Sequence, residues 1–161
     1  MRSIYLSFIA ALALLPEHTA AQEIIFLTGM ADYDNTEPDP PLNENGLSQA
    51  QAWARELAAA EIDAVFASNR RRSQQTAEPM ARANGLEVVT MPKDATQELV
   101  ARLKRDHAND QVFVTLHDPY ILPFLREFGY SGIVPSIILR DLLIIVPRAG
   151  EQPAVIHLRL E

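Results

Sequence analysis

The stretch DAVFASNRRRSQQTAEPMARANGLEVVTM, residues 63–91, decides the fold class of this chain. Both ends of the stretch are short, mostly apolar runs typical of strands. Between them lies a polar segment that we expect to form a helix, with a kink at Pro79 and an end at Gly85. A helix between two strands is typical of α/β proteins with mostly parallel sheets.

The same alternation continues along the rest of the chain. Apolar runs typical of strands lie at residues 23–27, 111–117, 142–146 and 154–160. Apolar residues at helical spacing lie at residues 47–60, 95–108 and 119–129. A turn with Pro and Gly joins the last two strands, which predicts an antiparallel pair. We therefore expect a three-layer α/β/α sandwich, with a mostly parallel central sheet and an antiparallel C-terminal edge pair.

Several helix details can be compared with a structure. The periodicity places Leu47 on the buried side of the first helix, and Met30 is expected to pack in the core. Asp94 and Asp118 each precede a helical segment and are expected as N-caps, with Pro119 in a favoured first-turn position. The buried stripe of the helix at 95–108 is expected to consist of Leu99, Val100 and Leu103.

The first 21 residues are typical of a secretory signal peptide. They contain Arg2, an apolar run over residues 4–15, and small residues before Gln22. The alternative is a membrane anchor, but the apolar run is shorter than the roughly 20 residues that span a bilayer. We expect cleavage after Ala21, one domain over residues 22–161, and an exported protein, most simply a bacterial periplasmic one.

The composition narrows the classes of partner. The chain has 161 residues, of which 48% are hydrophobic, and a formal net charge of −7. An acidic chain of this kind gives no indication of nucleic acid as a partner, and we expect no membrane contact after cleavage. Because the chain has no cysteine, disulfides and a lipid-modified N-terminal cysteine are both excluded.

The expected functional site lies where strands end, because open α/β sheets bind ligands at the carboxyl ends of their strands. Three junctions are informative: Thr28-Gly29-Met30, the arginines at 70–72, and His117. The cationic and titratable groups of the last two suit an anion such as phosphate. Consecutive arginines are also typical of a solvated face, and a lone histidine at a strand end is often structural.

Two sequence blocks resemble the histidine phosphatase superfamily, also called the phosphoglycerate mutase-like family. The family block Ser-Pro-Leu-x-Arg-x-x-x-Thr-Ala is matched by Ser68, Arg72, Thr76 and Ala77, with Asn69 and Arg70 replacing Pro and Leu. The family block Leu-Thr-x-x-Gly-x-x-Gln-Ala is matched by Leu42, Asn43, Gly46, Gln49 and Ala50. With the segment VFVTLHDPYILPFLREFG, the resemblance extends over nearly all of the chain after residue 22.

The resemblance implies a phosphatase mechanism that needs neither a metal nor a cofactor. A histidine in an Arg-His-Gly triplet after the first strand attacks phosphorus, while two arginines and a second histidine hold the phosphoryl oxygens. Position by position, the second arginine is Arg72 and the second histidine is His117. Asp118 follows His117, as in the His-Asp pair of the acid phosphatase branch, so proton donation is an alternative to its role as an N-cap.

The triplet itself does not carry over, because this chain has Thr28-Gly29-Met30 at that place. No backbone atom of Gly29 replaces an imidazole nitrogen as a nucleophile. We therefore expect a catalytically impaired member that binds phosphate or a phosphorylated small molecule through Arg72, His117, Thr28 and Gly29. Two alternatives stay open: a phosphomonoesterase with altered chemistry that uses His117, and a non-catalytic interaction protein with a vestigial pocket.

Overall fold

A computed structural model describes residues 23–133 and 141–159 of the chain, so the expected signal peptide lies outside the described residues. These residues form one six-stranded sheet with the strand order β3-β2-β4-β1-β5-β6. The strands are β1 (Ile24–Thr28), β2 (Ala64–Ser68), β3 (Val88–Met91), β4 (Gln111–Thr115), β5 (Asp141–Val146) and β6 (Ala154–Arg159). The helices are α1 (Glu44–Glu56), α2 (Arg71–Ala83), α3 (Thr96–Asp106) and α4 (Asp118–Glu127).

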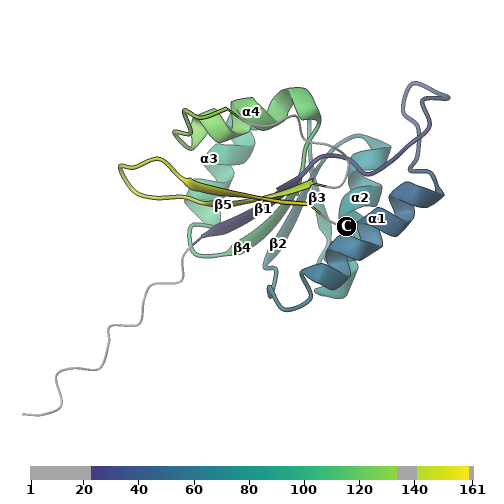
Figure 1. Cartoon of the computed structure of the whole chain (residues 1–161), viewed down its shortest axis with the longest axis horizontal. Coiled ribbons are helices and arrows are strands. Elements are labelled where there is room, and N and C mark those ends of the chain that lie inside the picture. Colours follow the sequence, from purple (N-terminus) through teal and green to yellow (C-terminus); the bar gives the residue numbers. More distant parts are fainter. Residues whose placement is uncertain (1–22, 134–140, 160–161) are drawn as a thin grey trace, which may run out of the picture.

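The helices cover the sheet in two layers, with α1 and α2 on one face and α3 and α4 on the other (Figure 1). β1, β2, β3 and β4 pair in parallel, while β5 runs antiparallel to β1 and β6 antiparallel to β5. This arrangement confirms the expected α/β/α sandwich and its antiparallel edge pair. It also brings the carboxyl ends of β1, β2 and β4 to the same edge of the sheet.

The central strands β1, β2 and β4 are mostly apolar because both of their faces are buried, and each ends in a buried hydroxyl residue, Thr28, Ser68 or Thr115. All five residues of β2 are buried, and so are the last four residues of β1 and of β4. Phe66 packs in the cluster beneath α3 and α4, whereas Phe113 packs in the cluster beneath α1 and α2. Because both faces of these strands are buried, the sequence shows continuous apolar runs here and not the alternation of apolar and polar residues that is typical of a half-buried strand.

The expected burial of Leu47 is wrong, since 45% of this residue is exposed. Helix α1 begins three residues before Leu47, and the N-cap Asn43 accepts a hydrogen bond from the Gly46 amide at 2.9 Å. Its buried positions are Gly46, Gln49, Ala50 and Trp53. Gly46 is needed for close approach, because an added Cβ would clash with the carbonyl oxygen of Asp32.

The N-caps of the two later helices also differ from expectation. Ala95, and not Asp94, is the N-cap of α3, and it makes no side-chain capping bond within the described part of the chain. His117, and not Asp118, is the N-cap of α4. The buried stripe of Leu99, Val100 and Leu103 is confirmed. A cap requires a side-chain oxygen at one backbone position, and a residue one step away does not reach the same amides.

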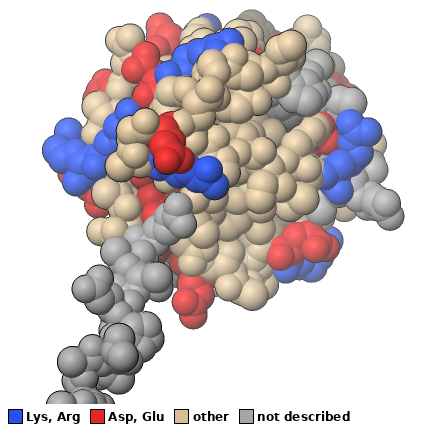
Figure 2. All heavy atoms as spheres, turned by 60° about the vertical axis from the view of Figure 1, so that its left-hand side comes forward, with Lys and Arg blue, Asp and Glu red and all other residues tan. Residues whose placement is uncertain are grey.

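Charged side chains do not form a single-sign surface on the side of the molecule that Figure 2 brings forward. Lys and Arg are interspersed there with Asp and Glu around a broad uncharged area (Figure 2). Within residues 23–133 and 141–159, no helix is long and apolar enough to cross a membrane.

Candidate functional site

The three junctions that the sequence singles out meet at one edge of the sheet. β4 lies between β2 and β1, and Thr115 is paired with Ala67 on one side and with Thr28 on the other. The segments that follow these strands therefore start side by side. They carry Gly29, the N-terminus of α2 and His117. Arg72 lies in the first turn of α2, so its side chain starts beside this edge.

The Arg72 side chain is held inside this site and is not part of a solvated face, since only 14% of it is exposed. Its Nε donates to Met30 Sδ at 3.1 Å, and its guanidinium lies over the Tyr33 ring, 4.6 Å from the centroid. Its Nη1 donates to Asp39 Oδ1 at 3.5 Å. Met30 is buried, as expected, but its sulfur also occupies one hydrogen-bonding direction of the guanidinium.

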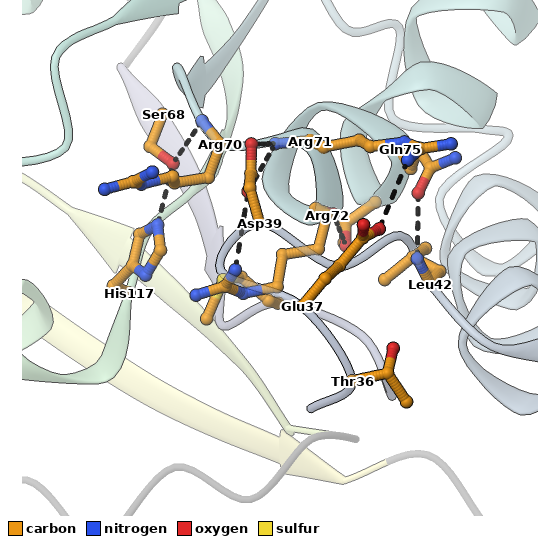
Figure 3. A network of polar contacts seen from close by, with 12 residues as sticks. Thr36, Glu37, Asp39, Leu42, Ser68, Arg70, Arg71, Arg72, Gln75 and His117 are labelled. Carbon is orange, nitrogen blue, oxygen red and sulfur yellow. Dashed lines mark hydrogen bonds and ion pairs between the residues drawn. The ribbon is translucent and has the colours of Figure 1, made fainter. Parts of the chain in front are cut away.

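Asp39 places a carboxylate at the N-terminus of α2. Its two oxygens accept from the Arg71 backbone amide at 3.2 and 3.3 Å, and Oδ1 also faces Arg72 (Figure 3). Free backbone amides and an arginine at a helix N-terminus form an anion site. The Asp39 carboxylate therefore occupies the anion site at the N-terminus of α2. Sequence analysis missed Asp39, because the residues that it contacts are more than 30 positions away.

The loop that carries Asp39 is anchored at both ends and exposed in the middle. At one end the Ala31 amide donates to Thr76 Oγ1 at 3.0 Å, and at the other the Leu42 amide donates to Gln75 Oε1 at 2.8 Å. Both acceptors belong to α2. Residues 34–38 between the anchors are exposed. The middle of the loop is tied to the start of α2 through the ion pair of Glu37 with Arg71, 3.5 Å between the charged atoms.

His117 is buried beside Arg72 and bonded to Ser68. Its Nε2 lies 2.9 Å from Ser68 Oγ, and 8% of the residue is exposed (Figure 3). Burial, followed by the positive charges of Arg72 and Lys93, lowers the pKa of His117 from its ordinary value of 6.5 to about 4. The imidazole is therefore neutral at pH 7. It offers a phosphoryl oxygen a hydrogen bond but no full positive charge.

Asp118 faces solvent as the first residue of α4. Partial burial of its carboxyl raises the pKa, and a hydrogen bond from its own backbone amide works in the opposite direction. Among the described residues, the Asp118 carboxyl forms no hydrogen bond or ion pair with His117 or Arg72, and its expected role as a proton donor stays a prediction.

The triplet after β1 contributes little direct chemistry. The Thr28 hydroxyl donates its one proton to the Asp141 carbonyl oxygen at 2.9 Å, and Gly29 has no side chain. His107 pairs with Asp110 beyond the end of α3, and His157 pairs with Asp141 on the edge strand. Neither imidazole belongs to the segment after β1. No cluster of three or more His, Cys, Asp or Glu suited to a metal occurs among the described residues.

Comparison with known proteins agrees with the fold. The sequence model of the histidine phosphatase superfamily (branch 1) matches residues 31–93, a span that begins directly after Met30. Among curated proteins none matches the chain.

Solved structures share the fold at low sequence identity. The protein histidine phosphatase SixA complexed with tungstate is 17% identical, with a TM-score of 0.72, covering 84% of this chain and 96% of its own. Phosphoserine phosphatase from Entamoeba histolytica in complex with 3-phosphoglyceric acid is 14% identical, with a TM-score of 0.62 and coverage of 86% and 98%. A His-to-Ala mutant of phosphoserine phosphatase from the same organism, in complex with phosphoserine, is 14% identical, with a TM-score of 0.59 and coverage of 83% and 94%.

Proposed function

Because the chain belongs to the histidine phosphatase superfamily, we propose that it binds phosphate or a phosphorylated small molecule without ordinary turnover. The site is the cradle formed by Arg72, His117 and the N-terminus of α2. The observation that carries the proposal is the contact of Asp39 with this cradle. A guanidinium and a helix N-terminus that already hold one carboxylate have the geometry to hold another oxyanion.

The incoming phosphate takes the place of the Asp39 carboxylate. Both groups present oxygens to the same amide of α2 and to the same guanidinium, so they cannot bind there together. Related structures hold tungstate, 3-phosphoglyceric acid and phosphoserine, all of which are oxyanions. The mutant that holds phosphoserine has lost a histidine, which shows for that protein that loss of an imidazole is compatible with binding.

Turnover is impaired because the resemblance places the nucleophile at position 29, where this chain has glycine. Deletion of a nucleophile lowers the rate of other enzymes by about 10⁴-fold to 10⁶-fold. The bond from Arg72 to the Met30 sulfur also takes one donor of the clamp that would stabilise transition-state charge.

Titration calorimetry with inorganic phosphate and with tungstate tests the proposal. We expect wild-type protein to bind both anions and Arg72→Ala to lose at least tenfold in affinity, since a charge-assisted hydrogen bond contributes about 1.5–3 kcal/mol. Arg71→Ala is the matched control, because 57% of its side chain is exposed and its contact with Asp39 is made by the backbone. Equal binding by Arg72→Ala and wild type would contradict the proposal and favour a vestigial pocket.

A phosphomonoesterase that uses His117 is the second candidate. Its support is the neutral imidazole, which is available as a base or nucleophile, beside the Ser68 hydroxyl. Purified protein would then release phosphate from a generic phosphomonoester without added metal, and His117→Ala would abolish the release. Release that persists in His117→Ala would count against this candidate.

Export to the bacterial periplasm is also a proposal, supported by the apolar run and small residues before Gln22. Fractionation of the host cell and mass measurement of the recovered chain test it. We expect a periplasmic protein that begins at Gln22, and an uncleaved chain in the cytoplasm would contradict export.

A further inference from the structure

Two cations beside the cradle have no counter-ion. Arg70 is the N-cap of α2, and Lys93 lies between β3 and α3. Both residues are partly buried. Among the described residues neither side chain forms a hydrogen bond or an ion pair, whereas Arg72 already faces Asp39. A positive charge that is partly withdrawn from water is stabilised by a nearby anion, so these two cations are available to a ligand.

The backbone places the two cations on neighbouring strand ends. β2 and β3 pair in parallel with Ser68 opposite Met91, and the Asn69 amide donates to the Met91 carbonyl oxygen at 2.7 Å. Arg70 follows Ser68 by two residues, and Lys93 follows Met91 by two residues. Because neighbouring strands lie about 4.8 Å apart, Arg70 and Lys93 start side by side at the edge of the sheet that carries the cradle.

His117 lies close to all of the cations at this edge. Burial, and then the positive charges of Arg72, Lys93 and Arg70, lower its pKa, so the three cations act on one imidazole. Figure 3 shows the Arg70 side chain on the His117 side of the site. The Arg72 guanidinium lies on the other side, next to Asp39 (Figure 3). The arrangement offers two adjacent anion positions, the first at Arg72 and the second at Arg70 and Lys93.

The charges match an anion larger than one phosphate. With Asp39 displaced, as the proposed function requires, the positive charges at the site are those of Arg70, Arg72 and Lys93. A phosphomonoester carries about −1.5 to −2 at pH 7, and a second phosphoryl group joined through an anhydride oxygen brings the total to about −3. A phosphoryl group also presents oxygens in several directions and so faces two cations at once, whereas a carboxylate has two oxygens in one plane.

We propose that the site binds a diphosphate group, with the terminal phosphate at Arg72 and His117 and the next phosphate at Arg70 and Lys93, an inference that rests on the proposed phosphate binding. The ligand class is a diphosphate monoester or inorganic diphosphate, which share this anionic group. The family block that this chain resembles has leucine where this chain has Arg70. The second phosphate position is therefore a feature of this chain and not of the block.

Calorimetry with four matched ligands tests this ligand class. The ligands are methyl phosphate, methyl diphosphate, inorganic diphosphate and phosphoglycolate, whose carboxylate gives it about the same charge as methyl diphosphate. We expect wild-type protein to bind methyl diphosphate at least about tenfold more tightly than methyl phosphate, as one added charge-assisted hydrogen bond provides. We also expect it to bind methyl diphosphate roughly threefold more tightly than phosphoglycolate, since a carboxylate faces only one of the two added cations.

The double variant Arg70→Gln with Lys93→Gln locates the second phosphate. It should lower the ratio of methyl diphosphate affinity to methyl phosphate affinity to about twofold or less, and it should stay folded in a melting curve because neither side chain forms a bond. Arg82→Gln with Arg105→Gln is the control, since it removes the same charge from side chains that are 77% and 68% exposed, and it should keep the wild-type ratio. A proton NMR titration gives a second measurement, in which the pKa of His117 should rise from about 4 in the double variant of residues 70 and 93.

Each result decides between one phosphate position and two. Equal affinity of wild-type protein for methyl phosphate and methyl diphosphate overturns the diphosphate and leaves the proposed function intact, and so does an affinity ratio that the double variant leaves unchanged. Equal affinity for methyl diphosphate and phosphoglycolate overturns the assignment of the second anion as a phosphate. If both diphosphates bind more tightly than methyl phosphate, the tighter of the two identifies the source of the group. Failure of wild-type protein to bind inorganic phosphate or any of these ligands overturns both the inference and the proposed function.

Discussion

Removal of the Asp39 charge should strengthen phosphate binding, because this carboxylate competes for the same donors. The nearest oxygen lies 3.5 Å from Arg72 Nη1, and unit charges at that separation attract by roughly 5 kcal/mol at an effective dielectric constant of about 20. The real contribution is much smaller, since 39% of the Asp39 side chain is exposed to solvent. Measured exposed pairs contribute about 1 kcal/mol at most, and a helix N-terminus adds about 0.3–1 kcal/mol.

The sum of at most about 1.3–2 kcal/mol corresponds to a gain of up to roughly tenfold to thirtyfold in phosphate affinity for Asp39→Asn. Asparagine keeps a side-chain oxygen that can accept from the Arg71 amide, so the loop and α2 should stay folded. Calorimetry at low ionic strength, with a melting curve for each variant, measures the effect. Glu37→Gln is the control, because Glu37 pairs with the exposed end of Arg71, at 3.5 Å, and should change affinity less than twofold.

Two results would refute this reasoning. Unchanged or weaker phosphate binding by Asp39→Asn would mean that the carboxylate does not compete with the ligand. An equal gain in Asp39→Asn and Glu37→Gln would mean that the gain reflects net charge alone and not a shared site.

Three further outcomes are expected. The folded protein should lose stability as pH falls from about 6.5 to 4, because His117 then becomes protonated in the unfolded chain but stays neutral in the folded protein. The difference between the two pKa values limits the loss to roughly 3 kcal/mol. In a plot of melting temperature against pH, His117→Gln should flatten this range. Gly46→Ala should lower the free energy of unfolding, measured by chemical denaturation, by about 1–3 kcal/mol, since the added Cβ would clash with the Asp32 carbonyl oxygen. The control Asn45→Ala, at an exposed position of the same helix, should change this free energy by less than about 0.5 kcal/mol. Changing residues 28–30 to Arg-His-Gly should create phosphomonoesterase activity in a colorimetric assay, and a folded but inert variant would show that the losses extend beyond this triplet.

The sequence predicts most of the fold because the strands of this sheet are marked locally. Strands buried on both faces, such as β2 and β4, have apolar residues at most positions, and helices such as α3 have apolar residues at helical spacing. The start of α1 is not marked in this way. Its buried face begins with Gly46 and Gln49, and neither residue counts in an apolar pattern.

The cradle is predictable only in part. Arg72 and His117 follow strand ends, so topology alone brings them together at one edge. Asp39 could not be found in this way, since it lies in an irregular loop and its contacts with α2 depend on how that loop folds back. The same holds for the bond between Ser68 and His117, which are 49 positions apart in the sequence.

The central claim is that the site binds a phosphomonoester and does not turn it over. Phosphorus NMR of wild-type protein with a phosphomonoester that is stable in water measures both binding and hydrolysis in one sample. We expect a saturable change in the ester resonance that Arg72→Ala removes, and no inorganic phosphate beyond that in a protein-free control. Steady release of inorganic phosphate, or an ester resonance that the protein leaves unchanged, would contradict the claim.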